Sequence, residues 1–179
     1  MLRNVLLGLI VLVLAIVAGA YLTPRHQHVE RDIIINASAE EIFPYLNSYQ
    51  EFNRWSPWAE LDPDAEYAFE GPAEGVGARF TWSGNNQVGT GAQEITISEF
   101  PNRLETLLDF EEEGVATAYF DLVPADGGGT HVTWGFDTDM GMNPIYRYIG
   151  LGMDKWVGAD YQRGLENLRD LVESEQAGE

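Results

Sequence analysis

The segment Ser38–Trp58 constrains the fold of this chain more than any other, because its helix signals begin and end sharply. A strand pattern over His28–Asn36 precedes it, with apolar residues at alternate positions. Ser38 and Glu41 have the spacing of a capping box, which predicts that a helix begins here. A second short helix is predicted over Tyr49–Trp55, ended by the proline that follows. The domain therefore starts with a strand and then two helices.

Beyond residue 65 the apolar residues recur at every second position, which is the period of half-buried strands. Tight turns separate these runs, so successive strands are expected to pair as an antiparallel meander rather than as βαβ units. The chain closes with a helical pattern over Met153–Val172. The fold class is therefore α+β, with about six or seven antiparallel strands and a long carboxy-terminal helix. After the first strand, further strands are expected over Glu66–Glu70, Val76–Ser83, Gly89–Phe100, Leu104–Phe110, Val115–Val123 and Thr130–Asp137.

An apolar run near the amino terminus, Val5–Leu22, contains no charged residue. A helix of this length spans about 27 Å, close to the ~30 Å hydrocarbon core of a bilayer. Two interpretations stay open: an uncleaved membrane anchor, or a signal peptide cleaved after Ala18-Gly19-Ala20. Because the run continues past that site, we favour the anchor. The expected organisation is an anchor (or signal peptide) over 1–24, a domain over 25–174 and a disordered tail over 175–179.

The flanking charges suggest how this run is oriented. Arg3 precedes it, and short basic amino termini usually stay in the cytoplasm. The domain is then expected on the periplasmic or extracellular side of a bacterial inner membrane, which the chain would cross once. The linker Thr23–Gln27 reaches at most about 18 Å when fully extended, so the domain would lie close to the bilayer.

Composition excludes several functional classes. The chain has 29 acidic and 10 basic residues, for a net charge of -19, and such a surface repels the phosphates of nucleic acids. The absence of cysteine excludes disulfides and thiolate nucleophiles. His26 and His28 have no evident third ligand for a metal ion. Since nucleotide-binding and hydrolase motifs are also missing from the sequence, neither a metal nor a cofactor is expected.

Aromatic residues on the strands and the last helix are candidates for the wall of a ligand pocket, which needs apolar sides and a few polar groups. The competing interpretation is that these side chains simply fill the core. No catalytic residue is assigned. His131 alternates with apolar neighbours and is expected in solvent, whereas Asp137 and Asp139 at a strand end could do acid–base work. The expected wall consists of Trp55, Trp58, Phe80, Trp82, Phe120, Trp134, Phe136, Met153, Trp156 and Tyr161.

The segment Met140–Leu151 is unusually apolar for a connection between elements. Asn143 and Pro144 could cap a short helix within it, since proline suits the first helical position. Three roles stay open for the segment. It could form a lid over a cavity mouth, contact lipid headgroups, where tyrosine is favoured, or pack under the sheet as an extension of the core.

A set of short motifs lies in order along the chain: Ala37–Phe43, Phe52–Trp58, Glu70-Gly71, Gly75–Gly77, Gly89–Gly91, Thr130–Trp134 and Gly164–Leu168. Together they resemble the START-like helix-grip superfamily, also called SRPBCC or Bet v 1-like, and within it the polyketide cyclase/dehydrase-like branch. The resemblance covers residues 28–174 and leaves out the amino-terminal run. It implies a curved antiparallel sheet wrapped around the long carboxy-terminal helix, with a cavity for hydrophobic molecules. Some relatives are enzymes, so the branch name alone assigns no reaction.

The expected function is that of a membrane-anchored module that binds or carries a hydrophobic, lipid- or polyketide-like small molecule. Its expected partners are that molecule and, through the amino-terminal helix, the membrane. Two alternatives stay open. A cyclase- or dehydrase-like enzyme needs an inward-pointing acid–base pair with a shifted pKa. An envelope protein-interaction module would show a filled cavity and a large exposed apolar patch. Binding without catalysis is favoured.

Overall fold

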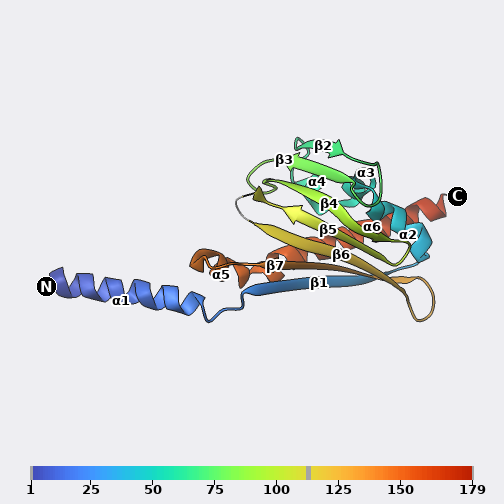
Figure 1. Ribbon diagram of the computed structural model, residues 1–179. Coiled ribbons are helices and arrows are strands. Elements are labelled where there is room, and N and C mark those ends of the chain that lie inside the picture. Colours follow the sequence, from blue (N-terminus) through green and yellow to red (C-terminus); the bar gives the residue numbers. More distant parts are fainter. Residues whose placement is uncertain (1, 112–113, 179) are drawn as a thin grey trace.

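The domain is built on one antiparallel sheet of seven strands, in the order β1-β7-β6-β5-β4-β3-β2 (Figure 1). This computed structural model describes residues 2–111 and 114–178. Every neighbouring pair of strands except β1 and β7 is also consecutive in the chain, as a meander requires. The pairing of β1 with β7 joins the beginning of the domain to its end. The strands are β1 (His26–Ile35), β2 (Glu66–Glu70), β3 (Arg79–Ser83), β4 (Thr90–Glu99), β5 (Arg103–Asp109), β6 (Val115–Pro124) and β7 (Thr130–Asp139).

The longest helix, α6, lies against the curved sheet, while α2, α3 and α4 cover one end of it (Figure 1). Along α6, Tyr161, Leu165 and Leu168 are buried at spacings of four and three residues, so one face of the helix enters the core. The predicted α+β architecture is therefore confirmed. The helices are α1 (Leu2–Ala20), α2 (Ala39–Asn47), α3 (Tyr49–Trp55), α4 (Pro57–Leu61), α5 (Pro144–Gly150) and α6 (Met153–Ala177).

Local sequence signals predicted correctly where the first two helices of the domain lie. The Ser38 hydroxyl accepts a hydrogen bond from the Glu41 backbone N–H (3.3 Å), and the Glu41 carboxylate accepts one from the Ser38 backbone N–H (2.8 Å). The capping box is thus confirmed, and α3 has the predicted bounds. The helix α4 differs from the sequence prediction, in which Pro57 only ends the preceding helix. Proline also fits the first position of a new helix, where its missing N–H has no intrahelical partner.

The third strand starts later than predicted. Alternation from residue 76 suggested a strand over Val76–Ser83, but β3 begins at Arg79. Gly75 and Gly77 have φ values of 79° and 88°, in the left-handed region that glycine tolerates and a strand cannot use. Val76 is 60% exposed as a result. The segment before Arg79 is therefore a loop whose alternation is incidental.

The last helix runs further than the sequence suggested. A disordered tail was predicted over 175–179, whereas α6 continues to Ala177, and Glu179 lies outside the described residues. Glu175 accepts hydrogen bonds from the Tyr45 hydroxyl and the Arg54 guanidinium. These long-range contacts hold the final turns of α6 against α2 and α3, and no local sequence pattern predicts them.

The amino-terminal helix α1 projects away from the domain (Figure 1). It is long and apolar enough to cross a membrane, and by length and composition it fits either a membrane span or a signal sequence. Its carboxyl end contacts α5, and Ala20 there is fully buried. The end of the sheet where β1 begins and β7 ends is consequently the end nearest to α1.

Candidate functional site

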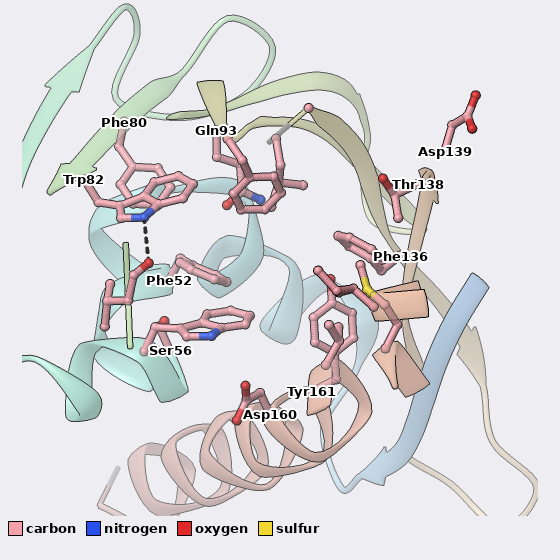
Figure 2. A pocket seen from close by; sticks show the side chains of 18 of the residues that line it. Phe52, Ser56, Phe80, Trp82, Gln93, Phe136, Thr138, Asp139, Asp160 and Tyr161 are labelled. Carbon is pink, nitrogen blue, oxygen red and sulfur yellow. Dashed lines mark hydrogen bonds between the residues drawn. The ribbon is translucent and has the colours of Figure 1, made fainter. Parts of the chain in front are cut away.

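A cavity of about 400 Å³ lies between the sheet and α6. Its size is within the ~300–1,000 Å³ range that is typical of small-molecule sites. The lining comes from α3, α4, strands β2–β5 and β7, α5 and α6, and it is mostly aromatic and aliphatic (Figure 2). Gly114 and Asp139, which lie at strand ends, line the cavity and are exposed to solvent, so we take this side as its mouth. These strand ends belong to the side of the sheet from which α1 departs.

The aromatic wall near β3 depends on a glycine. Trp82 on β3 pairs across the sheet with Gly91 on β4. A Cβ atom at position 91 would lie 2.4 Å from the Trp82 ring, so only glycine lets the indole lie flat over the neighbouring strand. The Trp82 indole N–H donates to the Val88 carbonyl (3.3 Å), the dashed line in Figure 2. The ring is thus held with one face toward the cavity.

Six of the ten residues predicted for the wall line this cavity. They come from α4, from the inward faces of β3 and β7, and from α6. On α6 the cavity-lining positions are spaced three or four residues apart, which places them on one side of the helix. Phe80, Trp82, Phe136 and Tyr161 appear in Figure 2 around the same space. The six are Trp58, Phe80, Trp82, Phe136, Met153 and Tyr161.

Three other predicted wall residues, Trp55, Phe120 and Trp134, are buried in the core instead. Trp134 stacks between Phe120 and Tyr161, with ring centroids 4.9 and 3.8 Å away. The Trp55 indole N–H donates to the Tyr45 carbonyl (3.0 Å), which turns this side chain toward α2. These three side chains therefore fill the core, and they pack behind the residues that line the cavity.

The tenth residue, Trp156, lies on the surface with 57% of its area exposed. Met153, Val157 and Tyr161 repeat every four residues along α6 and line the cavity. Trp156 is rotated about 100° from Val157 around the helix axis, which points it away from the sheet. Its assignment to the wall is corrected, and Val157 takes its place.

Several lining residues were missed by sequence reasoning. Leu108 and Phe110 continue the inward alternation of β5, so the alternation itself could have identified them as lining residues. Met140, Tyr146 and Ile149 come from the segment whose role was left open, and they close the cavity on the α5 side. The Asn143 side chain caps α5 as expected, by accepting from the Ile145 N–H (2.9 Å). Phe52 and Tyr67 also line the cavity, and only the packing of α3 and β2 brings them there.

A few polar groups reach the cavity. The buried Gln93 amide donates to the Thr106 hydroxyl (2.8 Å), so its N–H is already partly satisfied. The Tyr161 phenol is protonated at neutral pH, and burial raises its pKa further. A protonated phenol in an apolar cavity can donate a hydrogen bond to a ligand oxygen. Asp160 on α6 forms an ion pair with Arg163 (3.3 Å).

Asp137 and Asp139 have separate cationic partners. Both oxygens of Asp139 accept hydrogen bonds from the Arg25 guanidinium, at 2.6 Å each, which lowers the pKa of Asp139 to about 2. Figure 2 shows its carboxylate directed away from the other labelled side chains. Asp137 contacts the His28 ring (2.8 Å) and raises the pKa of that histidine. Asp139 is therefore not poised as a general acid at neutral pH.

Metal ligation finds no support in the part of the chain that the structure describes. No group of three or more His, Asp or Glu side chains there is arranged to hold a metal ion. His131, the histidine on β7, contacts Asp32 (2.9 Å) on the outer side of the sheet. The cavity lining is mostly apolar and includes a few hydrogen-bonding groups.

Solved structures with the same fold are numerous. Protein SA2116 from Staphylococcus aureus has a TM-score of 0.64 at 10% identity, over 85% of this chain and 96% of that one. The di-domain ARO/CYC StfQ from the steffimycin biosynthetic pathway has a TM-score of 0.61 at 13% identity, over 86% and 52%. Ara h 8.0201 has a TM-score of 0.57 at 12% identity, over 83% and 99%. At such identities the similarity shows the fold alone.

The family is shown by sequence. No curated protein matches the chain. A family model described as polyketide cyclase / dehydrase and lipid transport matches residues 26–173, which is nearly the whole domain. The match confirms the predicted resemblance, and it begins where β1 begins. This chain belongs to the polyketide cyclase/dehydrase and lipid transport family.

Proposed function

We propose that this protein is a membrane-anchored module that binds or carries a hydrophobic small molecule in the cavity between its sheet and α6. The observation that carries the proposal is the mostly apolar cavity of about 400 Å³. Aromatic walls such as Trp58, Trp82 and Phe136 favour a ligand with little exposed polarity. The Tyr161 phenol would orient one oxygen of that ligand.

The family description supports a lipid- or polyketide-like ligand. Catalysis is the weaker candidate. The two carboxylates of the cavity lining, Asp139 and Asp160, are each paired with an arginine. Tyr161 is protonated at neutral pH, so it suits hydrogen-bond donation better than proton abstraction. These features favour holding a molecule over transforming it. An interaction module is also less well supported, because the cavity is not filled by side chains.

Contacts between α1 and α5 support a retained anchor. The Tyr148 hydroxyl donates to the Ile16 carbonyl (2.7 Å), so the last turns of α1 are part of a folded contact. Cleavage after Ala20 would remove the partner of Tyr148. We place the domain outside the cytoplasm, in the periplasm of a cell whose inner membrane α1 spans, because Arg3 precedes the helix. Protease added to intact spheroplasts should digest the domain, and protection would contradict this orientation.

Ligand binding is tested with a matched pair of substitutions on β5. Leu108 lines the cavity, whereas its neighbour Leu107 is on the outer face and 43% exposed. Leu108→Trp should fill part of the cavity, and Leu107→Trp adds the same side chain outside it. Native mass spectrometry of the full-length protein, released from detergent micelles, would detect bound molecules as discrete mass increments.

We expect such increments on the wild type and on Leu107→Trp, and a several-fold weaker signal on Leu108→Trp. Thermal midpoints of the two variants should be compared, so that a loss of folding is not mistaken for a loss of binding. Increments that are missing from all three proteins, or equal on both variants, would contradict the cavity as the binding site.

A further inference from the structure

We propose that the protein makes a second contact with the bilayer, through α5 and the first turn of α6, at the mouth of the cavity. The partner is the interface of a zwitterionic lipid membrane. This inference rests on the proposed function in one respect, because it takes α1 as a membrane span. We call the contacting residues the apolar collar: Met142, Ile145, Tyr148, Ile149, Leu151 and Trp156.

The apolar collar is exposed although its side chains are large. The exposed fractions of its residues run from 40% to 66%. Isolated exposed apolar residues are common, but a group from one short helix and the adjacent turn marks an interaction surface. Tyrosine and tryptophan are also the residues that membrane–water interfaces favour. The collar therefore has the composition of an interfacial segment.

Its distance from α1 fits the depth of an interface. Tyr148 reaches the carbonyl of Ile16, four residues before the end of α1 at Ala20. At 1.5 Å per residue, this contact lies about 6 Å inside the end of the helix. Interfacial helices bury their apolar faces about 5–10 Å into the boundary between headgroups and acyl chains. When α1 spans the membrane, α5 therefore lies at that boundary.

The junction is held by several hydrogen bonds, so the collar cannot swing freely away from α1. The buried Arg147 guanidinium donates to the Thr23 carbonyl (3.0 Å) and to the Gly141 carbonyl (2.8 Å). The Tyr21 hydroxyl donates to the Met142 carbonyl (3.1 Å). The bonds to Thr23 and from Tyr21 join the residues just after α1 to α5 and to the turn that precedes it.

The distribution of charged residues also favours contact between the apolar collar and lipid. The chain has 29 acidic residues, yet residues 140–153 contain none. Two basic residues, Arg147 and Lys155, the sole lysine of the chain, lie in or beside this segment. Asp139 and Asp154 border this segment, and each is paired with an arginine, Arg25 and Arg31 respectively. Contact of the collar with lipid therefore desolvates no unpaired carboxylate. Glu111, in the turn between β5 and β6, lies at the same end of the sheet, so anionic lipid is the less suitable partner.

The contact would place the cavity mouth against the membrane. Ile149 belongs to the collar and also lines the cavity, next to Tyr146 and Met140. The strand ends that mark the mouth lie at the end of the sheet nearest to α1. A hydrophobic ligand could then pass between bilayer and cavity with little exposure to water.

The chain contains no cysteine, so single cysteines can report the position of the collar in the full-length protein. We would label Ile145→Cys and Leu151→Cys with an environment-sensitive nitrobenzoxadiazole dye. Val123→Cys, at an exposed apolar position at the opposite end of β6, is the matched control, and Val11→Cys in α1 reports membrane insertion. The proteins would be placed in phosphatidylcholine nanodiscs that contain nitroxide-labelled lipid, with the nitroxide on the upper acyl chain for positions 123, 145 and 151 and near the end of the acyl chain for position 11.

We expect blue-shifted emission and several-fold stronger nitroxide quenching at positions 145 and 151 than at position 123. Quenching at position 11 without quenching at 145 and 151 would overturn the collar contact and leave the anchor intact. A blue shift at 145 and 151 without lipid quenching would also overturn it, because another protein copy would then cover the collar. Should position 11 escape quenching, the anchor itself is contradicted and the collar contact with it.

Discussion

Gly164 is a residue at which α6 lies close to Trp134 of β7 and to Pro57. A Cβ atom there would lie 2.7 Å from the Trp134 ring and 3.1 Å from Pro57. Alanine adds about 1 kcal/mol of helix propensity, but overpacking of a core typically costs about 1–3 kcal/mol. We expect Gly164→Ala to lower the free energy of unfolding by up to roughly 2 kcal/mol, because the clash outweighs the gain. Denaturant unfolding in mild detergent would measure this change in the free energy of unfolding.

Gly158 on the same helix is the control for this prediction. A Cβ atom there meets the Arg31 guanidinium, the far end of a flexible side chain that is paired with the exposed Asp154. Since Arg31 can move, Gly158→Ala should stay within about 1 kcal/mol of the wild type. Equal destabilisation by both substitutions would contradict the distinction between a rigid and a movable neighbour.

The pair Arg25–Asp139 predicts a dependence on pH. The pKa of Asp139 is about 2 in the folded protein, below the ~3.9 expected in the unfolded chain. Its interaction with Arg25 therefore stabilises the fold above about pH 4, and this contribution disappears as the pH falls toward 2. The effect is small, because both side chains are exposed to solvent.

Asp139→Asn should thus lower the thermal midpoint slightly at pH 6, and the difference from the wild type should vanish in acid. Arg25→Gln removes the same ion pair, so its profile should follow that of Asp139→Asn. A difference from the wild type that grows as the pH falls below 4 would contradict this assignment.

At the scale of elements, the start of α2 depends on its capping box. Ser38→Ala removes the acceptor for the Glu41 N–H and should cost about 1 kcal/mol of stability. Ser38→Thr keeps a hydroxyl at the same place and should retain most of that stability. Chemical denaturation of the three proteins provides the measurement. If alanine and threonine behaved alike, the stability of α2 would have to come from packing of Ile42, Phe43 and Leu46 instead.

For the whole molecule, net charge sets the response to salt. With 29 acidic and 10 basic residues, mutual repulsion acts across the surface of the folded state. Raising ionic strength from about 0.01 to about 0.15 M shortens the Debye length from about 30 to about 8 Å. We therefore expect the thermal midpoint in potassium chloride to rise over this interval. A midpoint that falls would mean that the exposed ion pairs, which salt also screens, outweigh the repulsion.

Much of the fold could be predicted because its signals are local. The capping box at Ser38, the alternation in β3–β7 and the spacing in α6 each depend on residues within a few positions of one another. The wall residues Phe80 and Trp82 could be predicted from the sequence for the same reason. Trp156 was assigned to the wall wrongly, because a helical repeat of three or four does not distinguish it from Val157 until the facing surface is known.

The sequence by itself determined the fold class, the order of elements, the acidic surface and an apolar helix near the amino terminus. Only the tertiary structure decided which aromatic residues surround space and which fill the core. It also showed that the exposed residues of α5 lie beside α1, at the mouth of the cavity. The physical reason is that period and composition report which side of an element is apolar. The neighbour that covers that side comes from residues more than a hundred positions away, as Tyr148 and Ile16 do.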